Sequence, residues 1–256
     1  MVKRSYPFLL FSVYVLSLFS DQDALAYEDK DVIKVGITAQ VKPYVIDNDK
    51  AKGLDLELLN AIFSEMAYST QYYSIPYRRQ ATVMNNRNID AIAVWLFDDL
   101  DCFVSEPYRM WYNILVSLDR GLETDVQSLS DLKEGDIAAF YRANETILGF
   151  KETPLAKFSL LKFAPNAKLA LRMLRANRMR AYIGDIYGIS YYQKNDQDSQ
   201  KSVKLKNLYQ FKPNPQYLCF RDENLRDRFN QVTKKLRATN ILEDIETKYG
   251  KDLLLQ

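Results

Sequence analysis

One short pattern occurs twice in this chain, and it limits the possible folds more than any other feature. Residues 84–92 and residues 174–183 each read as the end of a helix, a polar turn that holds an Asn-Arg pair, and a buried strand. Ala91 and Ala181 occupy equivalent places in the two copies, 90 positions apart. Because each half carries its own helix-to-strand transition, two similar α/β lobes fit the sequence better than one large sheet. The alternative is chance similarity over a short stretch.

The segments around the first copy alternate between strand and helix patterns. Residues 32–37 form a β-branched run typical of a buried strand, and residues 54–63 place apolar residues at helical spacing. Asp55, near the start of that helix, is expected to cap its free amides. Further segments follow as a strand at 70–75, a helix at 79–84 and a strand at 89–94. The alternation predicts an α/β fold with parallel strands.

The chain passes between the two predicted lobes at two places. Residues 105–108 break regular structure before a strand at 112–118, and residues 212–215 precede a strand at 216–220 just ahead of the final helices. Two crossings make the first lobe discontinuous and leave a cleft and a hinge between the lobes. The boundaries that follow are residues 27–110 with 215–256 for lobe 1, and residues 111–214 for lobe 2.

The first 26 residues have the order of a secretory signal peptide. Two basic residues precede an uncharged, apolar stretch over residues 5–20, and Ala24 and Ala26 stand at the positions that a signal peptidase reads. We therefore expect cleavage before Tyr27. The alternative is a membrane anchor, which needs roughly 18–20 apolar residues, more than this stretch has. No cysteine lies at the junction to carry a lipid, so the sequence predicts a free protein in the periplasm.

Composition excludes several kinds of chemistry. The sequence contains no histidine, so catalytic triads that need imidazole and the usual His-ligated zinc sites are excluded. The 35 basic and 33 acidic residues leave a formal charge of +2, too balanced to gather nucleic acid or an anionic membrane. A phosphate-loop glycine pattern and a CxxC pair are also absent. We therefore expect no nucleic-acid partner, no metal and no cofactor.

Seven short motifs follow one another along the chain. They lie at residues 34–37 together with Pro43 and Tyr44, and at residues 53–55, 86–91, 103–108, 129–135, 181–185 and 245–251. In this order they resemble the extracytoplasmic solute-binding proteins, family 3, which serve polar amino-acid ABC importers. The resemblance implies an α/β, type II periplasmic-binding-protein fold: two lobes, each a β-sheet flanked by helices, joined by a two-strand hinge. It also implies a non-catalytic monomer that closes on a small amino-acid-like ligand and presents it to a membrane ABC permease.

The resemblance also places candidate ligand-binding residues. Tyr44 falls where the family has an aromatic ring that stacks on the ligand; the alternative is simple packing in its loop. Asp185 ends a strand where the family places the carboxylate that binds the ligand's ammonium group; alternatively, it caps the helix that follows. Asn144 lies where the family's helix-start residues hold a carboxylate, and neighbouring Arg142 either supplies positive charge there or lies in solvent.

The main departure from the family lies after Asp90. Family members carry a Thr-x-x-Arg segment there, whose arginine holds the ligand carboxylate, whereas residues 91–101 contain no arginine. Arg79 matches an arginine found at a helix start in some relatives, and Trp95 would offer a stacking face. The alternative places Arg79 on a solvated helix face and Trp95 in the core. The missing arginine predicts weak binding of simple α-amino acids unless Arg79 takes its role.

Two other functions fit the same resemblance. Some relatives are cyclohexadienyl or arogenate dehydratases, and this chemistry needs a general acid, for which Glu145 and Asp99 are the candidates. A binding protein without a transporter could instead serve as a sensor for a non-amino-acid ligand.

The chain has two cysteines, Cys102 and Cys219. They can pair in the oxidising periplasm, but a separation of 117 positions says nothing about their distance in space. The sequence therefore leaves a disulfide open.

Overall fold

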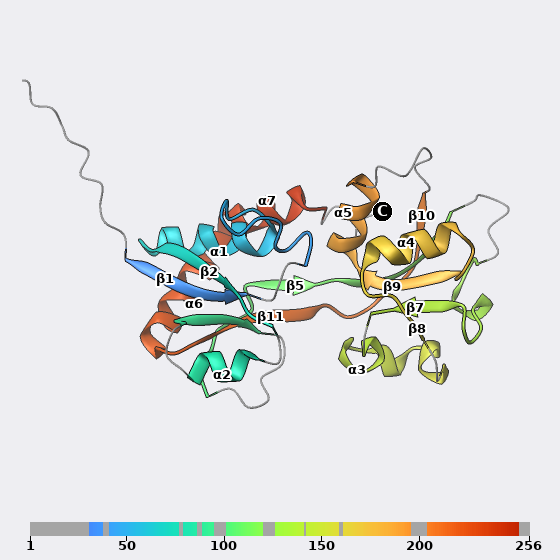
Figure 1. Ribbon diagram of the computed structural model, residues 1–256, viewed down its shortest axis with the longest axis horizontal. Coiled ribbons are helices and arrows are strands. Elements are labelled where there is room, and N and C mark those ends of the chain that lie inside the picture. The colour runs from blue at the N-terminus through green and yellow to red at the C-terminus, as the bar shows by residue number, and fades with distance from the viewer. Residues whose placement is uncertain are drawn as a thin grey trace, which may run out of the picture.

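The computed structural model describes residues 31–37, 41–76, 79–85, 89–94, 101–119, 126–140, 142–158, 161–195 and 204–250. These residues form two lobes, each built on its own β-sheet with helices packed against it (Figure 1). The predicted fold class, a two-lobed α/β protein, is confirmed. The predicted signal peptide lies outside the described residues.

The sheet of the first lobe mixes parallel and antiparallel strands. Across the sheet they are β2 (Ser69–Ser74), β1 (Val32–Ile37), β3 (Ala91–Val94), β11 (Asn214–Phe220) and β4 (Phe103–Val104), with β5 (Arg109–Trp111) paired to β11. β1 is parallel to β2 and β3, whereas β11 is antiparallel to its partners. The helices of this lobe are α1 (Leu54–Glu65), α2 (Gln80–Asn85), α6 (Glu223–Ala238) and α7 (Ile241–Lys248).

The second lobe repeats this plan. Its strands are β10 (Leu205–Gln210), β6 (Asn113–Leu118), β9 (Ala181–Asp185), β7 (Ile137–Ala139) and β8 (Lys162–Phe163). β8, β7, β9, β6 and β10 take the places of β2, β1, β3, β11 and β4, with the same parallel and antiparallel pairings. Its helices are α3 (Ala143–Thr146), α4 (Ala167–Arg175) and α5 (Ile186–Asn195), with short 3-10 helices at Leu129–Asp131, Phe150–Glu152 and Pro154–Lys157. The strands that carry Ala91 and Ala181 are buried in separate sheets, so the repeated pattern does mark two lobes.

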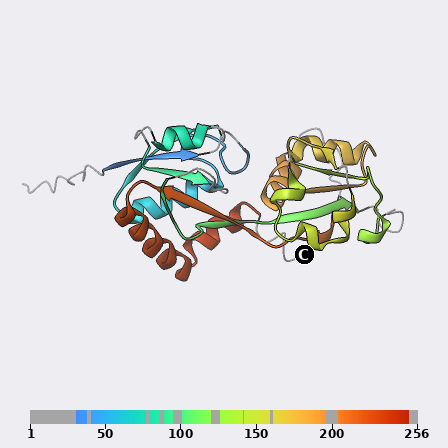
Figure 2. The ribbon, with the colours of Figure 1, turned by 90° about the horizontal axis from the view of Figure 1, so that it is seen from below.

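Two adjoining segments connect the lobes. Only Tyr112 separates β5 from β6, and residues 211–213 separate β10 from β11. β5 and β11 are antiparallel neighbours, so the two connections run side by side (Figure 2). Short paired strands of this kind allow one lobe to bend against the other, and they bring residues of the connection to the space between the lobes.

The start of α1 differs from the expected arrangement. Gly53 is the N-cap residue, with φ at 138°, and a Cβ there would lie 2.3 Å from the carbonyl oxygen of Tyr44. Only glycine fits this close approach. Asp55 lies one residue inside the helix and makes no capping hydrogen bond; its carboxylate pairs instead with Arg109. The prediction that Asp55 caps the helix is therefore wrong, because an ion pair across the lobe takes its side chain.

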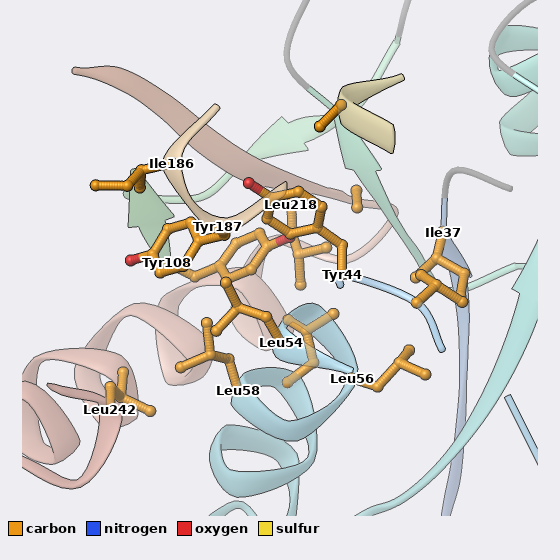
Figure 3. Packing of buried hydrophobic residues seen from close by; sticks show 14 of the residues in the cluster. Ile37, Tyr44, Leu54, Leu56, Leu58, Tyr108, Ile186, Tyr187, Leu218 and Leu242 are labelled. Atoms are coloured by element: carbon orange, nitrogen blue, oxygen red, sulfur yellow. The ribbon is translucent and has the colours of Figure 1, made fainter. Parts of the chain in front are cut away.

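One apolar cluster continues from the first lobe into the second. Tyr187, from α5 of the second lobe, is fully buried beside Tyr108 and Tyr44 of the first lobe, above Leu54 and Leu58 of α1 (Figure 3). The ring centroids of Tyr187 and Tyr44 are 6.1 Å apart in an edge-on contact. The start of α5 thus packs directly against the first lobe.

A disulfide joins Cys102 to Cys219, whose Cα atoms are 5.6 Å apart. β4 begins just after Cys102 and pairs with β11. Val104 of β4 lies opposite Cys219 of β11. The pairing that the sequence left open is therefore present in the structure. None of the helices within the described ranges has the length and apolarity needed to cross a membrane.

Candidate functional site

A cavity of about 490 Å³ lies between the lobes. Its wall is formed by the first lobe (Tyr44, Asp55), by the connecting strands (Trp111, Asn214) and by the second lobe (Asp185). This volume falls in the range of pockets that enclose small molecules. A site built from both lobes and from their connection can couple ligand binding to lobe closure.

Arg109 forms a buried ion pair in the cavity wall. Its Nε donates to Asp55 Oδ1, and its Nη2 donates to Asp55 Oδ2 over 3.1 Å. Burial disfavours the charge on Arg109, but the carboxylate of Asp55 offsets this and leaves the pKa of the guanidinium above its ordinary value. The third nitrogen, Nη1, is buried and has no hydrogen-bond partner among the described residues.

Two aromatic rings hold the same guanidinium. Its central carbon lies 4.3 Å from the ring centroid of Tyr44 and 4.1 Å from that of Trp111. A cation over an aromatic face is attracted by the negative potential of the ring. Arg109 is therefore held by the carboxylate of Asp55 and by two rings that also contact each other, with centroids 4.1 Å apart, and it is 1% exposed.

Asp185 both caps a helix and lines the cavity. Its Oδ2 accepts the backbone N–H of Gly188 over 2.8 Å, as a helix cap does at the start of α5. Asp185 lines the cavity, and its other oxygen, Oδ1, is buried without a hydrogen-bond partner in the described part of the chain. Burial raises the pKa of Asp185 to about 6, against the opposing effects of the Tyr44 hydroxyl, the Gly188 N–H and Arg109.

Amide side chains of the connecting strands line the cavity floor. Trp111 donates its indole N–H to Gln216 Oε1 over 2.6 Å, and Gln216 Nε2 donates to the carbonyl of Val94 over 2.7 Å. Asn214 Nδ2 donates to the carbonyl of Thr146, at the end of α3. The connection is thus hydrogen-bonded to the first lobe through Gln216 and to the second through Asn214.

The structure brings together some of the residues expected from the sequence and separates others. Tyr44 and Asp185 line the cavity. Arg79 is exposed at the start of α2 and does not line it. Trp95 and Asp99 lie outside the described residues.

Two of the expected residues, Arg142 and Asn144, lie at the start of α3. Arg142 and Asn144 are exposed, and neither lines the cavity. Arg142 Nε instead donates to Glu145 Oε2 over 2.6 Å. α3 is a single turn: its last residue, Thr146, lines the cavity, and its first residue, Ala143, is buried, while Asn144 and the N-cap residue Arg142 face solvent. Thr146 therefore lines the cavity, whereas Arg142 and Asn144 do not.

Sequence reasoning missed the residues of the connection. Arg109 and Trp111 directly follow the Pro107-Tyr108 motif, and Asn214 and Gln216 stand at the second crossing. A charged or aromatic residue at a predicted crossing is next to the cleft by topology alone, and this signal would have identified them. Within the described ranges, the acidic residues and cysteines form no group arranged to hold a metal ion.

Residues 33–252 match the profile of the bacterial extracellular solute-binding proteins, family 3. The chain belongs to this family. A comparison with curated protein sequences gave no match.

Several solved structures have a fold similar to that of this chain. A probable amino-acid ABC transporter extracellular-binding protein from Bacillus subtilis is 15% identical, with a TM-score of 0.68 over 87% of this chain and 98% of that chain. An ancestral cationic amino-acid solute-binding protein is 18% identical, with a TM-score of 0.65 over 86% and 96%. A histidine kinase sensor domain is 19% identical, with a TM-score of 0.62 over 87% and 98%. At these identities the similarity establishes the fold alone.

Proposed function

We propose that this family 3 protein binds a small amino-acid-like solute in the interlobe cavity and delivers it to an ABC importer. Two unmatched polar atoms in the cavity wall support this proposal most directly. Asp185 Oδ1 and Arg109 Nη1 are both buried, and neither has a hydrogen-bond partner among the described residues. Buried polar atoms are nearly always hydrogen-bonded in native proteins. A ligand with an ammonium group and an acceptor oxygen would satisfy both.

The structural neighbours support the ligand class. The Bacillus subtilis protein is named as an amino-acid transporter component, and the ancestral protein as a binder of cationic amino acids. A shared fold at such low sequence identity does not establish which ligand this protein binds, so the argument for an amino group on the ligand depends on Asp185.

We also propose that the protein acts in the periplasm and that its two lobes close on the ligand. Cleavage before Tyr27 would release a monomer into the periplasm, with lobe 1 over residues 27–110 and 215–256 and lobe 2 over residues 111–214. The short connections at Tyr112 and at residues 211–213 lie close to these boundaries. A ligand that contacts Asp55 or Arg109 on one side and Asp185 on the other would hold the lobes together.

We propose no catalytic role. Glu145, the general acid considered for a dehydratase, is exposed and paired with Arg142 outside the cavity. Prephenate and arogenate are therefore expected to remain unchanged on incubation with the protein.

Native mass spectrometry of protein secreted and purified without refolding tests the proposed function. The wild type is expected to retain a ligand of amino-acid size, and Asp185→Asn is expected to lose it. Asp222→Asn is the matched control, because Asp222 caps α6 outside the cavity and asparagine caps a helix equally well. Equal retention by wild type and Asp185→Asn would overturn the proposed site. Failure of the wild type to retain or bind any amino-acid-like compound would overturn the proposed function.

A further inference from the structure

We infer that the cavity selects organic cations without a free carboxylate, such as amines and amino-acid amides, over zwitterionic amino acids. This inference rests on the proposed function and names the substrate class of the same site. The charges of the cavity wall, the engagement of Arg109 and the aromatic lining each support it.

The described lining residues include four charged side chains: Lys42, Asp55, Arg109 and Asp185. Asp55 and Arg109 neutralise each other in a bidentate pair that is almost fully buried. Lys42 is exposed at the edge, where water and salt screen its charge. The remaining buried charge is the carboxylate of Asp185, so the enclosed part of the described wall is net negative.

Within the described part of the wall, a ligand carboxylate would meet no buried cation whose charge is not already offset. Asp55 already accepts from Nε and Nη2 of Arg109 and offsets its positive charge, so a ligand carboxylate bound to the remaining N–H groups would be repelled by the carboxylate of Asp55. The start of α4 also lines the cavity, but Asn166 accepts the N–H of Leu169 there over 2.9 Å and caps that helix. Nη1 of Arg109 has no partner among the described residues, and because Asp55 already offsets the charge of the guanidinium, its N–H groups suit a neutral carbonyl oxygen better than a second carboxylate.

Aromatic rings add to the preference for positive charge. Phe140, Tyr182 and Tyr192 of the second lobe line the cavity together with Tyr44 and Trp111. The guanidinium of Arg109 already lies against Tyr44 and Trp111. The rings of the second lobe line the same cavity as Asp185, and a carboxylate together with aromatic rings is a favourable setting for an organic cation.

Matched pairs of ligands test this inference on the wild type. Each common L-amino acid and its α-carboxamide would be compared by thermal shift, followed by calorimetry of the pairs that bind. The amide differs from the acid by one negative charge at nearly constant shape. We expect the amide of a binding pair to be favoured by about tenfold or more.

Two variants test whether the preference for the amide comes from the charge of the cavity wall or from its shape. Asp55→Asn removes one negative charge and frees Arg109, so the preference for the amide should fall by about tenfold and the acid should gain affinity. The double variant Asp55→Asn/Arg109→Gln removes the whole pair and leaves the net charge of the wall unchanged. Both ligands should bind it more weakly because the donor Arg109 Nη1 is lost, but the preference for the amide should remain, and the variant avoids the unpaired buried arginine that could unfold the single variant.

The outcomes are distinct. An acid that binds the wild type as tightly as its amide overturns the inference and leaves the proposed function standing. A double variant that prefers acids overturns it as well. If no acid and no amide binds, the proposed function fails and the inference fails with it.

Discussion

The indole N–H of Trp111 donates to Gln216 Oε1 over 2.6 Å, which links the two strands that connect the lobes. Gln216 is 5% exposed, and its Nε2 donates to the carbonyl of Val94 at the end of β3. The ring of Trp111 in turn makes a cation–π contact with the guanidinium of Arg109. Gln216 therefore fixes the ring that positions Arg109, without belonging to the charged part of the site.

Replacing Gln216 with methionine should weaken both the fold and ligand binding. The change leaves the indole N–H of Trp111 and the carbonyl of Val94 unpaired, at a cost of about 1–3 kcal/mol in the free energy of unfolding. Urea denaturation measures the first effect and calorimetry the second. Gln71→Met on the exposed face of β2 is the control, and equal stability of the two variants would contradict the account.

Acidification should weaken binding of an amine through Asp185. The groups that act on its carboxylate are the Tyr44 hydroxyl, the Gly188 N–H, Arg109 and Asp55, and burial is the largest influence, so its pKa is about 6. Below that pH the carboxyl is protonated and loses its attraction for an ammonium group. Affinity should be about tenfold lower at pH 5 than at pH 7, as measured by calorimetry. An affinity that is flat between these values would show that Asp185 does not bind the ligand's charge.

The same residue should reduce the stability of the ligand-free protein. Because the pKa of Asp185 is raised above its ordinary value of 3.8, the folded state binds this proton more tightly than the unfolded state. Its contribution to stability therefore falls as pH rises from about 4 to about 6 and stays low above that range. Asp185→Asn keeps an oxygen for the Gly188 N–H and removes the buried charge. We expect it to raise the thermal midpoint at pH 8 by a few degrees, with no gain at pH 4; lower stability at pH 8 would contradict this sign.

The disulfide should stabilise the first lobe substantially. It closes a loop between positions 117 apart, and the constraint on the unfolded chain is worth about 2–5 kcal/mol. The double variant Cys102→Ser/Cys219→Ser should lose that amount in urea denaturation. A reductant should destabilise the wild type and leave the double variant unchanged. Equal stability of the two proteins under oxidising conditions would exclude this role.

Much of the fold could be predicted because its signals are local. A β-branched run predicted β1, helical spacing of apolar residues predicted α1, and the two copies of the helix-to-strand pattern predicted separate sheets. The role of Asp55 could not be predicted in this way. An aspartate near a helix start normally suggests a cap, and only the tertiary approach of Arg109 from another segment gave it a different partner.

The candidate site was predictable in part for the same reason. Tyr44 and Asp185 lie in motifs with a fixed place in the fold, and both reach the cavity. The start of α3 does not, because its single turn exposes Arg142 and presents Thr146. Arg109 escaped notice because its burial depends on Tyr44, Asp55 and Trp111 meeting around it, and no local pattern encodes that meeting.

The central claim is that Asp185 holds the positive charge of a solute in the interlobe cavity. Calorimetric titration of the tightest-binding amine or amide into wild type, Asp185→Asn and the control Asp222→Asn tests it directly. We predict that Asp185→Asn binds at least roughly thirtyfold more weakly than wild type, while Asp222→Asn is unchanged. An affinity of Asp185→Asn equal to that of wild type would contradict the claim.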